Sequence, residues 1–252
     1  MLAAERHHQI LDALAEHGSV RTKNIASSLD VTNETIRKDL ETLETQGFLV
    51  RTHGGAVPPN RVLRELSLTE RQMINREAKA EIAKAAASRI APDETIFIDA
   101  SSTALSITQY LPDFPFTVIS NSHDVITALG AIEHIDLICT GGLYETKSRS
   151  FIGPTAAKML RGYNIHRMFF SGNGLDLERG VSESNPRQAA FKEHVIKASE
   201  DVCFMADASK VGHRSAFFFC ACSELTTLIT TRDASPDILA ALGDLSVEAI
   251  AV

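Results

Sequence analysis

The sequence lacks the long apolar runs that would place it in or across a membrane. No run in its 252 residues approaches the about 20 apolar residues that a membrane-spanning helix needs. Its first ten residues, MLAAERHHQI, carry charge where a signal peptide is apolar. We therefore expect a cytoplasmic chain with no membrane contact.

Cysteine is scarce, and its spacing does not favour a metal site. Cys139 and Cys203 lie inside strand-like apolar runs, where a reduced, buried thiol is the ordinary state. Cys220 and Cys222 are separated by one residue, and no second pair of ligands follows them. We predict no metal site and no cofactor.

The chain also lacks an excess of positive charge. Its net charge is -7, and acidic residues outnumber basic ones even within the first 57 residues. A general basic coat for nucleic acid is therefore excluded. Any binding to DNA must come from a local face, and from two copies of it, because one small module makes few phosphate contacts.

Residues 20–57 follow the order of a helix-turn-helix with a wing. Apolar spacing predicts a short helix over 22–29 and a second helix that Thr32 caps and Gly47 ends. Residues 48–51 read as a strand with a flexible tip at 53–55. A helix over 3–16 and a strand over 19–21 precede this motif, so the sequence predicts a complete winged domain.

The start of the second helix carries polar and basic side chains that suit a DNA major groove. Cations on the wing would lie against phosphate. The alternative is that these side chains form an ordinary solvated face, and the turn and the wing together favour the DNA interface. The predicted DNA-binding residues are Thr22, Thr32, Asn33, Glu34, Thr35, Arg37, Lys38, Arg51 and His53.

Two consecutive prolines, Pro58-Pro59, mark the end of this domain. We predict a winged helix-turn-helix domain over 1–57, a charged linker over 58–76 and a second domain over 77–252. In the second domain helices alternate with short apolar strands, which predicts an α/β fold with a mostly parallel sheet. The expected strands are 95–98, 116–120, 135–139, 165–170, 202–205, 225–230 and 248–252.

Small and polar residues follow these strands repeatedly, at the sheet edge where open parallel sheets bind ligands. Ser101, Ser102 and Thr103 begin a helix, so they are either a phosphate seat or ordinary helix caps. Lys210 either faces a ligand anion or pairs with Asp207. The predicted effector-binding residues are Asp99, Ser101, Ser102, Thr103, Asn121, Gly141, Gly142, Gly172, Asp207 and Lys210.

The chain resembles the DeoR family of bacterial repressors over nearly its whole length. The matching segments are 35–40, 51–56, 98–103, 120–122, 140–142 and 207–210, together with Glu70-Arg71, Asn75 and Lys79. The resemblance implies a sensor domain that looks like ribose-5-phosphate isomerase without its catalysis and binds a phosphorylated sugar. The family usually has glycine at Ala100 and an acidic residue near Gln188. The loops at 99–103 and 121–123 look most like the L-fucose regulator branch.

Two other functions compete with a regulator. A sugar-phosphate isomerase needs a carboxylate base and a cation for the enediolate, but residues 171–175 lack the three acids of the isomerase loop. A stand-alone sugar-binding module leaves the helix and wing unexplained. We predict a non-enzymatic repressor of a carbohydrate-catabolism operon that binds double-stranded operator DNA and a sugar phosphate, as a homodimer or homotetramer.

Overall fold

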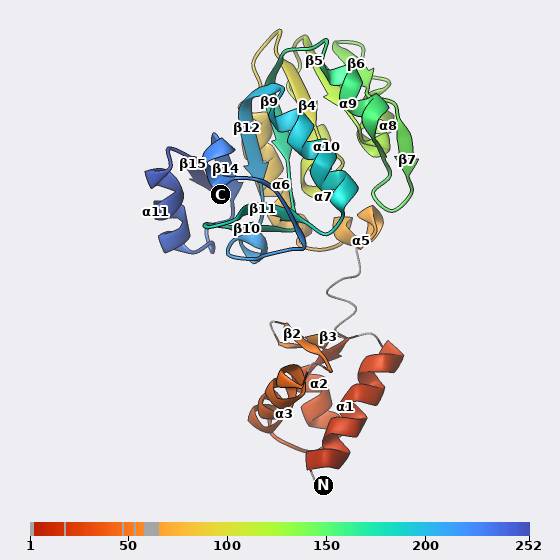
Figure 1. Ribbon diagram of the computed structural model, residues 1–252, viewed down its shortest axis with the longest axis vertical. Helices are drawn as coiled ribbons and strands as arrows, with labels where there is room; N and C mark the ends of the chain where they lie inside the picture. The colour runs from red at the N-terminus through yellow and green to blue at the C-terminus, as the bar shows by residue number, and fades with distance from the viewer. Residues whose placement is uncertain (1–2, 18, 47, 53, 58–65) are drawn as a thin grey trace. The chain divides into compact units, whose positions relative to one another are not determined.

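The computed structural model describes residues 3–17, 19–46, 48–52, 54–57 and 66–252 (Figure 1). These residues form two compact units, one within residues 1–65 and one over 66–252. No helix in the described ranges is both long enough and apolar enough to cross a membrane.

The first unit has the predicted winged helix-turn-helix. Its elements are α1 (Ala3–His17), β1 (Val20–Arg21), α2 (Thr22–Ser28), α3 (Asn33–Thr45), β2 (Val50–Thr52) and β3 (Gly55–Val57). The strands form an antiparallel sheet in the order β1-β3-β2. Gly55 allows this pairing, because a Cβ there would meet the carbonyl oxygen of Val20 at 1.9 Å.

The wing begins two residues later than the sequence predicts. Phe48 donates its N–H to the carbonyl of Leu43 at 2.9 Å, so it belongs to the end of α3 and not to a strand. Leu49 is buried in the core of the unit, and β2 starts at Val50. Thr32 caps α3 as predicted, since its hydroxyl accepts the N–H of Thr35. The predicted cap at Gly47 and the predicted contact at His53 lie outside the described residues.

A buried carboxylate ties α1 to α3. Arg6 donates to Asp39 through Nε at 2.8 Å and Nη2 at 3.0 Å, and His7 Nε2 lies 3.1 Å from the same carboxylate. Burial alone would raise the pKa of Asp39, but the hydrogen bonds from Arg6 and His7 outweigh it and hold that pKa below its usual value.

The second unit is an α/β domain. Its helices are α5 (Leu68–Gln72), α6 (Arg76–Ala87), α7 (Ser102–Leu105), α8 (His123–Leu129), α9 (Pro154–Leu160), α10 (Pro186–Ile196) and α11 (Pro236–Asp244). Its strands are β4 (Thr95–Ile98), β5 (Phe116–Ser120), β6 (Ile135–Cys139), β7 (Leu143–Glu145), β8 (Ser150–Ile152), β9 (Ile165–Phe170), β10 (Gly174–Asp176), β11 (Gly180–Glu183), β12 (Ser199–Met205), β13 (Phe217–Cys220), β14 (Thr227–Thr230) and β15 (Glu248–Ala251).

The predicted parallel sheet is confirmed. Seven strands lie in the order β15-β14-β12-β9-β4-β5-β6, and every neighbouring pair is parallel. The chain runs outward from β4 through β5 to β6 and then returns to β9 on the other side of β4. The strand order therefore reverses between β4 and β9, where open parallel sheets form a ligand crevice at their carboxyl ends.

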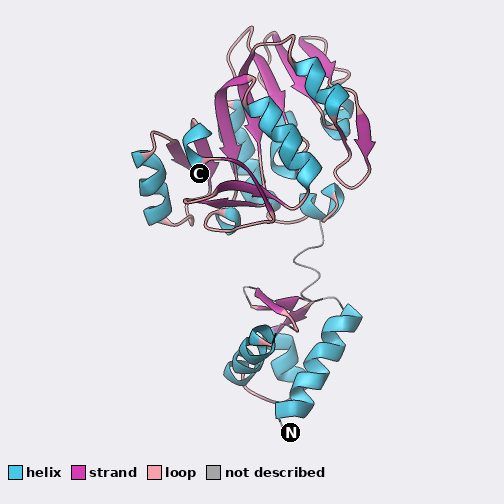
Figure 2. Ribbon diagram, viewed as in Figure 1, coloured by secondary structure: helices cyan, strands magenta, loops and turns pink. Residues whose placement is uncertain are grey.

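Helices cover both faces of this sheet (Figure 2). On β4, Phe97 faces the core beneath α9 and α10, whereas Ile96 and Ile98 face the core beneath α6, α7 and α8. This alternation follows from the two-residue period of a strand. The sequence did not predict the β7–β8 hairpin or the antiparallel sheet β10-β11-β13, which lie outside the parallel sheet.

The second unit begins at Leu66, eleven residues earlier than the domain boundary that the sequence predicts. The expected linker over 58–76 contains α5, which has a capping box: Ser67 accepts the Glu70 N–H, and the Glu70 carboxylate accepts the Ser67 N–H. Leu68 is fully buried and donates its N–H to the carbonyl of Lys147 at 2.9 Å. This local capping and packing turn the end of the linker into part of the domain.

Substitution of Asp39 by asparagine should destabilise the first unit by about 1–2 kcal/mol, because the charge-assisted bonds to Arg6 are lost and partial exposure screens the rest. The stabilisation is present above the usual unfolded pKa of aspartate, about 3.9. It is lost as the pH falls through the lower pKa of the folded state. Amide hydrogen exchange in α1 and α3 of the full chain measures both effects, and unchanged protection in the variant would contradict them.

Candidate functional site

One face of the first unit carries a groove of about 230 Å³ between α3, the start of α2 and the wing. Four of the predicted DNA-binding residues line it: Thr22, Asn33, Arg37 and Arg51. Lys23 and Thr52 also line it, and the sequence analysis missed both. Lys23 could have been found from its position directly after Thr22 in the first turn of α2.

Of the remaining predicted residues, Thr32 caps α3, and Glu34, Thr35 and Lys38 lie on its first turns, whereas His53 lies outside the described residues. Glu34 pairs with Arg37 at 3.3 Å, and both side chains are about two-thirds exposed at 66% and 64%. The Thr32 hydroxyl lies 2.9 Å from that of Thr35, so both take part in the helix cap. The Glu44 carboxylate accepts the N–H of Arg51 at 2.7 Å and fixes the wing against the end of α3. The cations of helix and wing therefore stand on one firmly connected face.

A second cluster lies where the strand order reverses in the parallel sheet. Lys192 of α10 points its ammonium at the carboxylates of Asp99, 3.0 Å away, and Glu183, 2.5 Å away. It also donates to the carbonyl of Ser171 at 2.6 Å. Burial disfavours this ammonium, but the two carboxylates outweigh burial and hold the pKa of Lys192 above its usual value. The cluster joins the loops after β4 and β9 to β11 and α10.

Neither Lys192 nor Glu183 was predicted from the sequence. Lys192 interrupts the buried face of its helix, between Ala189 and Ile196 at helical spacing. A lysine on an apolar face needs a partner, and that was the available signal. Glu183 gave no such signal, since it lies on a short strand that the sequence did not predict.

Lys210 lies on the other side of Ser171. Its Nζ donates to the Ser171 hydroxyl at 3.2 Å. Burial lowers the pKa of Lys210 to about 8; the carboxylate of Asp207 opposes this shift, and the charges of Lys79 and Arg71 add to it. Asp207 accepts from Asn75 at 3.0 Å and from the hydroxyl of Ser209, so neutral donors also hold this carboxylate.

Lys79 completes a group of cations around Asp207. Its side chain is only 4% exposed and donates to the carbonyls of Arg71 at 2.5 Å and Ile74 at 2.7 Å. Burial lowers the pKa of Lys79, Asp207 opposes that shift, and Arg71 adds to it. Lys79, Lys210 and Arg71 thus influence one another near the carboxylate of Asp207, and the carboxylate of Glu183 also acts on Lys210.

In the predicted phosphate loop, residues 101–103, only some of the hydroxyl groups are available to a ligand. Ser101 caps α7 by accepting the N–H of Ala104 and donates its hydroxyl to Asp99 at 2.5 Å, so this hydroxyl is engaged. Thr103 is fully buried, and its hydroxyl has no hydrogen-bond partner within the part of the chain that the structure describes. Ser102 lines a cleft of about 580 Å³ beside Arg76 and Lys79. The α-helix ends at Leu105, so its dipole is short.

Of the other predicted effector residues, Asn121 and Gly172 are buried, whereas Gly142 is exposed. Asn121 is 1% exposed and donates to the carbonyl of Phe151 at 3.2 Å, so it holds the β7–β8 hairpin. Gly141 and Gly142 follow β6, an edge strand two positions from β4. A Cβ at Gly142 would meet the carbonyl of Ile152 at 2.7 Å, and one at Gly172 would meet Val181 at 2.8 Å. Close packing requires glycine at both positions.

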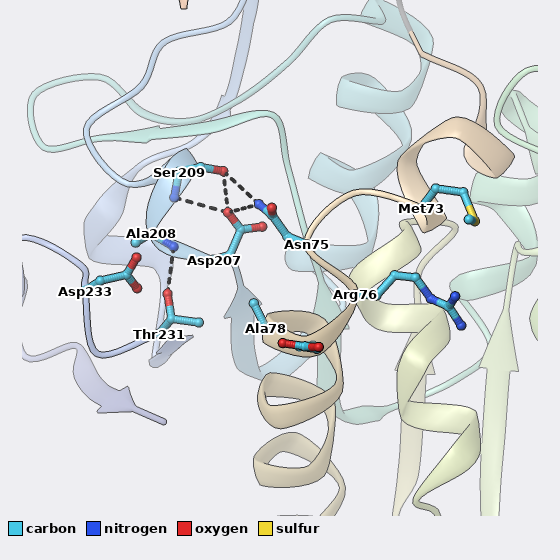
Figure 3. A pocket seen from close by; sticks show the side chains of 10 residues that line it. Met73, Asn75, Arg76, Ala78, Asp207, Ala208, Ser209, Thr231 and Asp233 are labelled. Atoms are coloured by element: carbon cyan, nitrogen blue, oxygen red, sulfur yellow. Dashed lines mark hydrogen bonds between the residues drawn. The ribbon is translucent and has the colours of Figure 1, made fainter. Parts of the chain in front are cut away.

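A second cleft, of about 520 Å³, opens beside Asp207. Figure 3 shows Asn75, Asp207 and Ser209 converging on its wall, with Ala208 bonded to Thr231. Both clefts share Met73, Arg76 and Glu77 at the start of α6. Within the described ranges no group of three or more histidine, cysteine, aspartate or glutamate side chains could hold a metal ion.

Known proteins match both units. Residues 6–62 match the DeoR-like helix-turn-helix domain, and residues 74–232 match the DeoR C terminal sensor domain. An uncharacterized HTH-type transcriptional regulator of Bacillus subtilis (strain 168), YulB, is 38% identical over 100% of this chain and 98% of its own. The L-fucose operon activator of Haemophilus influenzae is 34% identical over 90% of this chain and 91% of its own.

A putative aga operon transcriptional repressor of Escherichia coli O157:H7 is 30% identical over 99% of this chain and 94% of its own. Among solved structures, ribose 5-phosphate isomerase A of Methanocaldococcus jannaschii matches 54% of this chain and 55% of its own. Its TM-score of 0.39 at 14% identity carries no functional argument. The two family models together cover the winged unit and the sensor unit, and the relative from Bacillus subtilis matches the whole chain. The chain therefore belongs to the DeoR family of transcriptional regulators.

Proposed function

We propose that this protein represses a carbohydrate-catabolism operon and that a phosphorylated sugar, bound at the carboxyl edge of the parallel sheet, controls its hold on the operator. The observation that carries the proposal is that the ammonium groups of Lys79 and Lys210, near Asp207, donate to carbonyl and hydroxyl oxygens and, within the described residues, to no carboxylate. A dianion there would supply the missing countercharge.

The DNA-binding half of the proposal rests on the groove of the first unit. Lys23, Arg37 and Arg51 gather beside Asn33, so base-reading and phosphate-binding side chains share one face. The chain as a whole is acidic, and one such face makes few phosphate contacts. We therefore propose that two or more copies bind together. The role of repressor follows the name of the aga relative, which matches 99% of this chain.

An isomerase with an added DNA-binding domain is the second candidate. The carboxylates of Asp99 and Glu183 near the switch point give it some support that the sequence did not. Both are bound to Lys192, however, and a general base must be free to take a proton. Asp176, the residue directly after the loop 171–175, is also engaged, because its carboxylate pairs with Arg214 at 2.7 Å. Turnover of a sugar phosphate by the pure protein, lost in the variant Glu183→Gln, would favour the enzyme.

Substitution of Arg37 by alanine should abolish specific operator binding and leave the fold intact. Loss of one bidentate base contact costs about 1–3 kcal/mol, and a dimer would lose it twice. Footprinting and fluorescence anisotropy on the DNA upstream of the gene measure the effect. Arg161→Ala, which removes an exposed arginine of the second unit, is the control. If the Arg37 variant protects the same operator with unchanged affinity, α3 does not read it.

Sugar-phosphate binding should weaken as the pH rises through about 8, the value to which burial lowers the pKa of Lys210. The anion favours the protonated ammonium, so affinity is full below this pKa and declines above it, where binding must take up a proton. Isothermal titration at pH values on either side of 8 measures the change. Lys210→Arg keeps the charge at all these pH values and should reduce the pH dependence. An equal pH dependence in this variant would exclude Lys210.

Thr103→Val tests the phosphate loop without disturbing the fold. The Thr103 hydroxyl has no partner within the described residues, so its removal should leave stability unchanged or raise it by about 1 kcal/mol. If this hydroxyl binds the effector, the same variant should lose sugar-phosphate affinity about tenfold. Thr230→Val is a matched control, because that hydroxyl is equally buried and also lacks a partner. Equal effector affinity in both variants would remove Thr103 from the site.

A further inference from the structure

The helix α5 is the first element of the second unit, and it is fixed at both ends. At its start the Glu70 carboxylate accepts the N–H of Ser67 at 2.9 Å, and Leu68 donates its own N–H to the carbonyl of Lys147 in the β7–β8 hairpin. Leu68 is fully buried. This five-residue helix is too short to hold its shape alone, so its position depends on these contacts.

At its other end α5 is held by Lys79. The ammonium donates to the carbonyls of Arg71 and Ile74, which lie at and just beyond the last turn of the helix. Both acceptors are neutral, although Lys79 also feels the charge of Asp207. A buried ammonium bonds more strongly to an anion than to a neutral carbonyl. An anion at this edge therefore competes directly with α5 for Lys79.

A second connection runs through Asn75, the residue before α6. It adopts a left-handed conformation with φ of 51°, and its side-chain amide donates to Asp207 at 3.0 Å (Figure 3). Between these two anchors, Met73 and Ile74 are 68% and 47% exposed. Little apolar burial would be lost if this turn moved. The turn joins α5 to the loop after β12 and can change position at low cost.

We propose that α5 carries the state of the effector site to the DNA-binding unit, with Lys79 and Asn75 as the groups that couple it to the ligand. This proposal rests on the proposed function and names how that site is regulated. Ligand oxygens at the sheet edge draw the Lys79 ammonium from the carbonyls of Arg71 and Ile74, and the end of α5 is released. The helix begins at the third residue of its unit, so its movement acts directly on the chain that leads to the first unit.

The test weakens the N-terminal cap of α5, at the opposite end of the helix from the carbonyls that Lys79 binds. Glu70→Ala removes the carboxylate that accepts the Ser67 N–H and lets the helix fray. Glu224→Ala is the matched control, since Glu224 likewise accepts the N–H of Ala221, at 2.7 Å, in a turn outside both clefts. The probes are ribose 5-phosphate, fructose 1-phosphate and glucose 6-phosphate. For each full-length protein we would measure operator affinity with and without the probe, and probe affinity by isothermal titration.

In the unmodified protein one of these probes should change operator affinity by about 5- to 150-fold. In Glu70→Ala the probe should bind at least as tightly, because the frayed helix competes less for Lys79, but the change in operator affinity should fall below about twofold, whereas Glu224→Ala should respond like the unmodified protein. A normal response in Glu70→Ala, or loss of probe binding in it, would overturn the role of α5 and leave the proposed function standing. If no probe binds or changes operator affinity in the unmodified protein, the proposed function fails, and the role of α5 with it.

Hydrogen exchange on the unmodified protein gives a second measurement that does not depend on a variant folding or binding DNA. The probe that changes operator affinity should also change the protection of amides 69–74 by about tenfold, because the carbonyls that Lys79 holds are released. Protection in α11, which connects the edge strands β14 and β15, should stay constant. Unchanged protection over 69–74 would overturn the proposal.

Discussion

The ammonium of Lys192 is the group on which the architecture of the sensor unit depends. It lies 5% exposed between the carboxylates of Asp99 and Glu183 and donates to the carbonyl of Ser171. These three partners come from the loop after β4, the end of β11 and the loop after β9. Removing Lys192 would leave the two buried carboxylates without a countercharge, at a cost of about 3–5 kcal/mol. The loops at the switch point are therefore held in place before any ligand arrives.

This internal pairing divides the charged groups of the sheet edge into two sets. Lys192 pairs with two carboxylates and stabilises the fold, whereas Lys79 and Lys210 donate to neutral oxygens, with the carboxylate of Asp207 nearby. In the second set, Lys79 lines one cleft and Asp207 lines the other. The structure also gives a reason for the glutamine at position 188, near which the family usually has an acidic residue. Gln188 donates to the carboxylate of Glu145 at 2.7 Å, and an acidic residue at this position would place two carboxylates in contact.

The elements that local sequence determines were predictable. The cap at Thr32, the apolar stripe of α3 and the alternation of strands and helices each depend on residues close together in the chain, and each is confirmed. The helix α5 was missed because five residues are too few for a period to appear.

The candidate site was less predictable than the fold. Loops at strand ends predicted a sheet edge for the effector, but they did not indicate which side chains stay free of structural hydrogen bonds. Ser101 and Asn121 turned out to be engaged in structural hydrogen bonds, and Gly142 is fixed by the close approach of Ile152. Lys79 and Glu183 became candidates only when the fold brought distant segments together. Such contacts depend on tertiary packing and leave little trace in sequence spacing.

The proposed function requires one chain to couple the binding of a sugar phosphate to the binding of operator DNA. The most direct test is to titrate the responsive sugar phosphate into the full-length protein with and without saturating operator, and to titrate the operator with and without the sugar phosphate. Linkage requires the two ratios of affinities to be equal. Each ligand should change the affinity for the other by the same factor, about 5- to 150-fold. Equal sugar-phosphate affinity with and without operator would contradict it.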